Sequence, residues 1–260
     1  MMHGFRRLLG SAVLLATLAG CTTARPPVTP MEILHDAASC ASRAPALLVM
    51  LPGAYSQPAD FRAHGFVTAV RSRGLAADIV MADAHLGYFT DHSVIRRIRE
   101  DIVLPGRQAG YGHVWLVGIS LGGFAALGYA ARHGNDIDGA VTIAPYPGSR
   151  EVLREIAEGG GLASWHAPER TDDDDLEREV WTWLADGMKT PDRKPVVYLG
   201  YGRTDRFAEG NRMIAGTLPA DRALAVPGGH DWPPWLAVWD AWLDRGLLPR
   251  QCNDPTGSQE

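Results

Sequence analysis

The stretch HVWLVGISLGGFAAL, residues 113–127, decides the fold of this chain. It opens with a run rich in valine, tryptophan and leucine, continues through the motif GISLG at residues 118–122, and ends in alanine, phenylalanine and leucine. The first part predicts a buried strand, the motif predicts a sharp turn, and the last part predicts a helix. The sequence therefore places Ser120 at the tip of a turn between a strand and a helix.

The residues around Ser120 are of the types that nucleophilic chemistry needs. Gly118 and Gly122 suit such a turn, because the backbones of the strand and the helix come too close there for a Cβ atom. The N–H group of Leu121 would lie at the amino end of the helix, where a free donor and the helix dipole both favour an oxyanion. The alternative is a glycine-rich structural turn that carries a surface serine.

Short apolar runs alternate with helix-period segments throughout the chain. Strands that are apolar on consecutive residues are typical of a parallel sheet with helices on both faces. The sequence therefore predicts an α/β fold with a doubly wound, mostly parallel sheet. The predicted strands are residues 46–51, 78–81, 113–119, 139–143, 195–199 and 224–226, and the predicted helices are residues 61–73, 93–102, 124–133, 207–214 and 234–243.

Residues 147–193 interrupt this alternation, because they contain no convincing strand. Two helices are expected there, at residues 151–157 and 175–188, and the acidic run at 172–175 is expected to cap the second rather than bind Ca²⁺. We interpret the segment as a helical insertion, which could cap the site around Ser120 or equally be an outlying decoration. Three tryptophans of the insertion are candidates to line a pocket over Ser120: Trp165, Trp181 and Trp183.

A serine becomes a good nucleophile when a histidine accepts its proton and an acid orients that histidine. Both residue types follow later predicted strands. Asp205 ends the segment GYGRTD after the strand 195–199, and His230 lies in PGGHD after the strand 224–226. The order along the chain is serine, aspartate, histidine, and the neighbouring Asp231 is expected to be a solvated loop acid.

By the order and spacing of these motifs, residues 45–245 resemble the α/β-hydrolase superfamily. The resemblance implies Ser120 as the nucleophile, His230 as the general base and Asp205 as the acid that orients it. In this superfamily the loop after the strand predicted at residues 46–51 supplies a second oxyanion donor. The resemblance therefore implies the backbone N–H of Ala54, with Tyr55 next. That loop reads LPGAY rather than His-Gly-Gly-Gly, so it looks more like the carboxylesterase, lipase and thioesterase branches.

The function expected from these residues is that of a serine hydrolase that cleaves carboxylic esters through an acyl-enzyme. A thioesterase, a peptidase or an acyltransferase uses the same three residues, and a noncatalytic binding module of the cell envelope is the competing class. The expected partner is a small-molecule or lipid-like acyl substrate. No metal or organic cofactor is implied. A zinc site is not expected, because four of the histidines have no metal-ligand spacing with another histidine, cysteine or acid: His64, His92, His133 and His166.

The amino terminus predicts export. Residues 1–20 contain two arginines followed by a short apolar run, which is the layout of a secretory signal. The ending LAGC resembles the lipobox of bacterial lipoproteins, which implies a lipid on Cys21, and Thr22 in the following position implies the outer membrane, facing the periplasm. Residues 21–44 would then form a tether and an N-terminal segment. A plain secreted protein is the alternative.

Composition and charge agree with a globular domain over residues 45–250 and a tail at 251–260. The chain has 260 residues, 46% of them hydrophobic, and a formal net charge of −5, which excludes disorder and disfavours nucleic acid as a partner. Cys40 and Cys252 remain near the two ends of the domain, and they could form a disulfide or stay free thiols. The sequence leaves the oligomeric state open.

Two further groups of residues have an expected role. Asp83 and His85 follow another predicted strand at the same edge of the sheet, and we interpret them as polar loop residues, with pocket lining as the alternative. A tryptophan stripe near the carboxyl end has helical spacing, which indicates a buried helix face more than a substrate-binding or membrane-facing one. Its members are Trp232, Trp235, Trp239 and Trp242.

Overall fold

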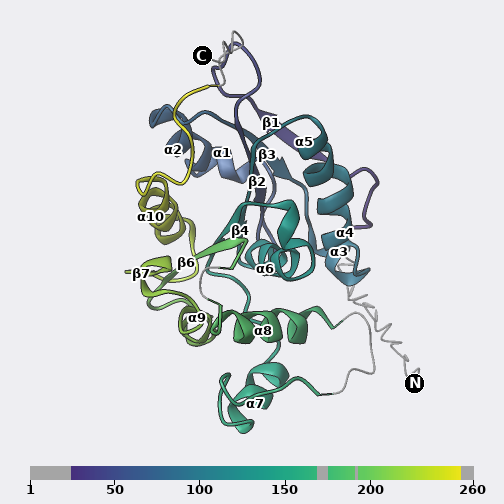
Figure 1. Ribbon diagram of the computed structural model, residues 1–260, viewed down its shortest axis with the longest axis vertical. Coiled ribbons are helices and arrows are strands. Elements are labelled where there is room, and N and C mark those ends of the chain that lie inside the picture. Colours follow the sequence, from purple (N-terminus) through teal and green to yellow (C-terminus); the bar gives the residue numbers. More distant parts are fainter. Residues whose placement is uncertain (1–24, 169–174, 191–192, 253–260) are drawn as a thin grey trace, which may run out of the picture.

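Seven strands form one sheet in the computed structural model, which describes residues 25–168, 175–190 and 193–252 (Figure 1). Their order across the sheet is β1-β3-β2-β4-β5-β6-β7, and all neighbours are parallel except β1, which is antiparallel to β3. The strands are β1 (Ile33–Asp36), β2 (Ala46–Leu51), β3 (Ala77–Ala82), β4 (His113–Ile119), β5 (Gly139–Ile143), β6 (Val196–Gly202) and β7 (Ala223–Val226).

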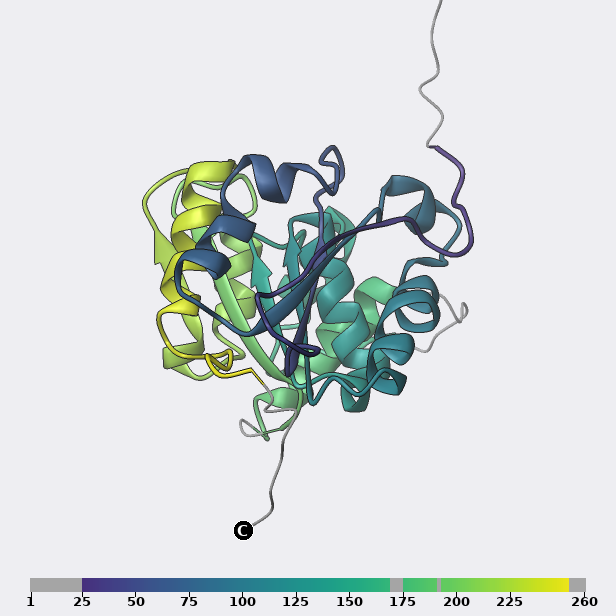
Figure 2. The same ribbon diagram turned by 90° about the horizontal axis from the view of Figure 1, so that it is seen from above.

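Helices cover both faces of this sheet, as the apolar strands require. Figure 2 shows α2 and α10 on one face and α4, α5 and α6 on the other. The α-helices are α1 (Asp60–Ala63), α2 (Phe66–Ser72), α3 (Leu86–Thr90), α4 (Val94–Ile98), α5 (Leu104–Gln108), α6 (Leu121–His133), α7 (Arg150–Glu158), α8 (Leu176–Gly187), α9 (Ala208–Ala215) and α10 (Trp232–Leu243). A π-helical turn (Arg99–Val103) joins α4 to α5, and 3₁₀ turns are formed by Gly134–Asp136 and Ala220–Arg222. The predicted doubly wound, mostly parallel sheet is confirmed.

The chain reverses its direction of travel across the sheet between β2 and β4. From β2 it moves outward to β3, then crosses back and adds β4 on the other side of β2. In doubly wound sheets such a reversal opens a crevice at the carboxyl ends of the two strands, where ligands bind. Here those ends lead into the loop at Gly53 and into Ser120.

The six predicted strands are present, but several boundaries and three elements differ from the predictions. The predicted helix 61–73 is divided in two, because Gly65 takes a left-handed conformation with φ of 87° before α2 begins. The strand β1 was not predicted, because three of its four residues are exposed and it lacks the apolar run of the central strands. The short helices α3 and α5 were not predicted either.

The tryptophan stripe of α10 lies in the core, as its spacing indicated. Trp239 and Trp242 are at most 1% exposed and Trp235 is 7% exposed. The indole N–H of Trp239 donates to the backbone oxygen of Phe66 at 3.1 Å, which fixes α10 against α2. Trp232, the first member, is only partly buried and stacks on His64 with ring centroids 4.1 Å apart. The other three members pack the last helix on the sheet.

The insertion stacks outward from α6, with α8 next to α6 and α7 beyond it (Figure 1). The side chain of Leu176 packs so closely on Gly128 of α6 that a Cβ atom there would lie 2.9 Å from it. Arg132 of α6 pairs with Glu179 of α8 at 2.6 Å. These contacts attach the start of α8 firmly to the helix that follows Ser120.

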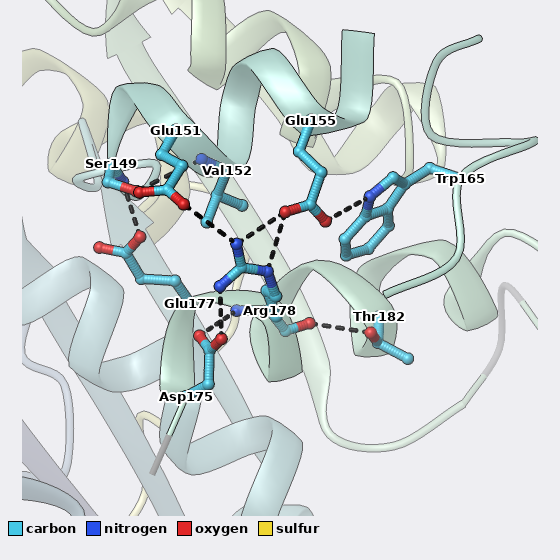
Figure 3. Close-up of polar contacts among 9 residues, drawn as sticks. All are labelled: Ser149, Glu151, Val152, Glu155, Trp165, Asp175, Glu177, Arg178 and Thr182. Atoms are coloured by element: carbon cyan, nitrogen blue, oxygen red, sulfur yellow. Dashed lines mark hydrogen bonds and ion pairs between the residues drawn. The ribbon is translucent and has the colours of Figure 1, made fainter. Parts of the chain in front are cut away.

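Arg178 is the polar centre of the insertion (Figure 3). Its guanidinium donates to both Glu155 of α7, at 2.7 Å, and Asp175, at 2.6 Å, while the Asp175 side chain also accepts the Arg178 backbone N–H and so caps α8 as expected. Hydrogen bonds from Arg178 hold the pKa of Glu155 below its usual value. Because the ionised form is the one favoured, this contact stabilises the insertion at neutral pH and weakens as the pH falls below 4.5.

The insertion's tryptophans do not fill a pocket over Ser120. Trp181 is 1% exposed and donates its indole N–H to the backbone oxygen of Pro147, and Trp165 is 6% exposed and donates to Glu155. Trp183 stacks against the guanidinium of Arg193 at 3.6 Å. Trp165 and Trp183 line hollows at the insertion itself, and none of the three lines a cavity beside Ser120. The expectation that they form a pocket over Ser120 is therefore wrong, because these side chains hold the insertion together.

Replacing Arg178 with methionine is expected to loosen the insertion without unfolding the sheet. The loss of its bonds to two carboxylates should cost about 1–2 kcal/mol, since the groups are partly exposed. We expect faster cleavage by thermolysin within residues 147–193, with Lys189→Met as the matched control, because Lys189 is exposed and contacts only Asp186, at 3.8 Å, among the ion pairs of the described residues. Equal cleavage rates for the two variants would contradict this role of Arg178.

A disulfide joins the two ends of the described chain. Cys40 and Cys252 are bonded, with Cα atoms 5.7 Å apart and 212 residues of sequence separation.

Several predicted segments lie outside the described residues: the signal segment 1–20, Cys21, Asp172–Asp174 and residues 253–260. Within the described part, no helix combines the length and the hydrophobicity that crossing a bilayer requires.

Replacing both Cys40 and Cys252 with serine is expected to lower the free energy of unfolding substantially. Closing a loop of this length stabilises a protein by about 5 kcal/mol in the chain-entropy model. Urea unfolding of the oxidised wild type and of the double variant measures the difference. A variant with an unchanged unfolding midpoint would show that the bridge contributes nothing to stability.

Candidate active site

Ser120 lies on a tight turn between β4 and α6. It has φ of 53° and ψ of −114°, a conformation that non-glycine residues rarely adopt. Ser120 is buried, with only 5% of its surface exposed. A Cβ atom at Gly118 would lie 2.2 Å from the oxygen of Gly122, and one at Gly122 would lie 2.1 Å from the oxygen of Leu51. The two motif glycines are therefore required by close backbone contacts, as the sequence predicted.

His230 bridges Ser120 and Asp205. Its Nε2 lies 3.0 Å from the hydroxyl oxygen of Ser120, and its Nδ1 lies 2.8 Å from Oδ2 of Asp205. The Asp205 side chain is fully buried, and that of His230 is 11% exposed. The structure thus brings together three residues that are 110 and 25 positions apart in the sequence, with hydrogen-bond distances throughout.

The loops that carry Asp205 and His230 are bonded to each other. The backbone N–H of Thr204 donates to the oxygen of Gly228 at 3.0 Å, and a Cβ atom at Gly202 would lie 2.3 Å from that same oxygen. Asp205 is fixed further, because its Oδ1 accepts the backbone N–H of Phe207 at 2.7 Å. One carboxylate oxygen therefore holds the loop while the other faces the histidine.

Two aromatic rings orient the imidazole of His230. Phe207 and Trp235 both contact it edge to face, with centroid distances of 5.1 and 4.9 Å. These contacts restrict rotation of the ring about its bonds, so that both nitrogens keep their partners. Sequence analysis gave Phe207 no role, and its position two residues after Asp205 was the available signal.

The predicted oxyanion donors lie around Ser120. Leu121 is the first residue of α6, so its N–H has no acceptor one turn earlier within the helix. On the other side, Gly53 is close enough to the Ser120 side chain that a Cβ atom there would approach its Cβ to 3.4 Å. Ala54 and Tyr55 follow as the central residues of a turn closed by the Ser56 N–H to the Gly53 oxygen at 3.1 Å. Their N–H groups are therefore not used by that turn.

Two cavities flank these donors. The first, of about 330 Å³, reaches Leu121 and is mostly apolar, with Phe124 and Tyr146 in its wall; its other lining residues are Phe89, His92, Val94, Ile95, Arg132, Asp175, Leu176 and Glu177. The backbone N–H groups of Phe124 and Tyr146 both donate to the backbone carbonyl oxygen of Ser120 at 3.0 Å, so two residues of the cavity wall are bonded to the main chain of the serine. Burial and the neighbouring Glu177 raise the pKa of Tyr146, whose hydroxyl donates to that carboxylate at 3.0 Å.

The second cavity, of about 660 Å³, is more polar and begins at Ala54 and Tyr55. Asp83 and His85 line it, so the interpretation of these two as plain loop residues was incomplete. Asp83 is paired with Arg25, and His85 Nδ1 accepts the Gly87 N–H at 3.1 Å and caps α3. Burial, and then the charge of Arg25, lower the pKa of His85.

Asp231, the acid next to His230 in the sequence, does not take part in the site. Asp231 caps α10 by accepting the N–H of Trp232 at 2.7 Å, which leaves Asp205 as the acid that faces His230. Within the ranges that the structure describes, no three histidine, cysteine or acidic side chains are grouped so that they could hold a metal ion.

Comparisons with known proteins give structural similarity without sequence similarity. No protein-family model matches the chain, and no curated protein matches it significantly. S-formylglutathione hydrolase from Staphylococcus aureus superposes with a TM-score of 0.54 at 14% identity, over 85% of this chain and 83% of that one. Est1E from Butyrivibrio proteoclasticus, with ferulic acid bound, gives 0.54 at 17% identity, over 82% and 94%. With this sheet order and these neighbours, the chain has the α/β-hydrolase fold.

Proposed function

We propose that this chain is a serine hydrolase that cleaves carboxylic esters. The observation that supports the proposal most strongly is the continuous hydrogen-bonded path from the Ser120 hydroxyl through His230 to the buried Asp205. Such a path activates a hydroxyl that is otherwise a weak nucleophile. Among the structural neighbours, a ferulic acid esterase is named for ester hydrolysis and S-formylglutathione hydrolase for hydrolysis of a thioester; at 16% and 14% identity they support acyl hydrolysis in general.

The reaction follows from this geometry. The Ser120 oxygen attacks the acyl carbonyl carbon while His230 Nε2 takes the hydroxyl proton, and the negative charge on the former carbonyl oxygen is held by the N–H groups of Leu121 and Ala54. The protonated His230 then gives its proton to the leaving alcohol oxygen as the bond from carbon to that oxygen breaks. Water releases the acyl group from Ser120 by the same steps, with His230 again as base. Asp205 stabilises the imidazolium.

The competing hypothesis of a binding module is weakened by the 3.0 Å distance between Ser120 and His230. A retained fold without activity would leave no reason for a strained serine beside a correctly oriented histidine. We also propose, from the sequence of residues 1–21, that the protein is exported and lipid-anchored at Cys21 in the bacterial outer membrane, facing the periplasm.

Labelling with a fluorophosphonate probe tests the proposed activity. The folded wild-type domain is expected to be labelled covalently at Ser120, and Ser120→Ala and His230→Ala are expected to stay unlabelled. A panel of acyl esters and thioesters then separates the ester hydrolase from the thioesterase. A folded wild type that takes up no label at all would refute the serine hydrolase.

A further inference from the structure

Exposed apolar side chains gather on one edge of the molecule. Among the described residues, six large hydrophobic side chains are exposed, and five of them belong to the N-terminal segment, β1, the loop after β2 and the start of α3. We call these five the apolar rim: Val28, Ile33, Leu34, Tyr55 and Leu86. The sixth, Met188, lies at the end of α8 in the insertion.

The rim surrounds the second cavity beside the predicted oxyanion loop. Ile33, Leu34 and Tyr55 line that cavity, and Leu86 follows His85, which also lines it. Tyr55 is the most exposed of the set, at 93%, and it directly follows Ala54. Exposed apolar groups clustered around a cavity mouth mark an interaction surface rather than ordinary surface composition.

The N-terminal segment is fixed across the same edge. The Tyr88 hydroxyl donates to the Val28 oxygen at 2.8 Å and accepts the Val28 N–H at 3.1 Å, and the Met31 N–H donates to Asp101 at 2.8 Å. Arg25 pairs with Asp83 in the cavity wall. Figure 2 shows this purple segment at the edge where the loop after β2 and α3 also lie.

Arg25, the first described residue, therefore lies at the rim. Cys21 precedes Arg25 by four residues, which span at most about 14 Å when fully extended. A lipid on Cys21 would hold the rim within that distance of the bilayer. An apolar surface held that close to the bilayer can insert into the interface and add buried apolar area to the attachment.

We propose that the apolar rim docks on the surface of the lipid bilayer and presents the second cavity, with Ala54 and Tyr55, to acyl lipids within it. The proposal rests on the proposed ester hydrolysis and on the lipid at Cys21, and it names the substrate class of that site as membrane-resident acyl esters. The contact is apolar rather than electrostatic, because the chain carries a net charge of −5 and Arg25 is already paired. A tyrosine at the contact suits an interface, since its ring is apolar and its hydroxyl is polar.

Depth in the membrane tests the docking without relying on catalysis. The full lipidated chain, as Leu86→Cys or Met188→Cys, is labelled with a bimane fluorophore and bound to phosphatidylcholine vesicles that contain brominated lipids. We expect quenching of the label at position 86 and none at position 188. Equal quenching at both positions, no vesicle binding, or a contact between two copies detected by crosslinking at position 86 would overturn the proposal.

Activity provides a second measurement. The variant Val28→Glu/Leu86→Glu is compared with Met188→Glu, a control that places a charge away from the rim, on a soluble acetate ester and on a long-chain ester dissolved in vesicles. We expect the rim variant to lose about tenfold or more on the vesicle substrate, because two charges oppose insertion, and to keep its rate on the soluble ester. Equal rates for both variants on vesicles would overturn the docking. A wild type that is inactive on both esters, with position 86 still quenched, would refute the hydrolase and leave the docking supported.

Discussion

Replacing Ser120 with alanine is expected to lower kcat for ester hydrolysis by about 10⁴- to 10⁶-fold, the range found when the nucleophile of such a triad is removed. The hydroxyl that attacks the carbonyl is lost, while the cavities and the N–H groups of Leu121 and Ala54 remain. The variant should therefore still bind an ester, with little change in affinity. Steady-state kinetics together with ligand binding to the variant measure both quantities.

Ser93→Ala is the matched control for this variant. Ser93 is also 5% exposed, and it lies before α4, outside the triad. Both variants remove one buried hydroxyl, so both should fold and unfold nearly as the wild type does. A Ser120→Ala variant that hydrolyses esters as fast as Ser93→Ala would show that another group is the nucleophile.

The site was predictable from sequence because its requirements are local. The elbow needs a strand, two glycines and a helix within fifteen residues, and the glycine contacts with Leu51 and with the neighbouring turn show why no other residue fits. Asp205 and His230 each lie in the loop that follows a strand of the parallel sheet, so their convergence at one edge follows from topology. Phe207 and Trp235 could not be assigned, because their roles depend on which ring faces His230.

The surroundings of the site were less predictable because they depend on distant contacts. Arg25 reaches Asp83 across 58 positions, and this pair places the N-terminal segment beside the second cavity. The tryptophans of the insertion looked like pocket residues by composition, yet Trp181 bonds to Pro147 within its own segment. Hydrophobicity predicts burial, but it does not say against which partner a side chain is buried.

Asp205→Asn is expected to lower kcat by about 10⁴-fold, although the two side chains have the same shape. The reason lies in Oδ1 of Asp205, the carboxylate oxygen that does not face His230, because it accepts the Phe207 N–H at 2.7 Å. In the asparagine variant this N–H should hold the amide oxygen, which turns the amide NH₂ toward His230 Nδ1. That nitrogen must then accept a hydrogen bond, so the ring proton moves to Nε2, where it blocks removal of the Ser120 proton.

Asp231→Asn separates this effect from a general loss of negative charge. Asp231 is the neighbour of His230, but its side chain caps α10, so its replacement should leave kcat close to that of the wild type. The rate of fluorophosphonate labelling should fall in parallel with kcat for Asp205→Asn alone, because both reactions need the Ser120 proton removed. Loss of activity in Asp231→Asn, with Asp205→Asn unaffected, would mean that the acid of the triad has been assigned to the wrong residue.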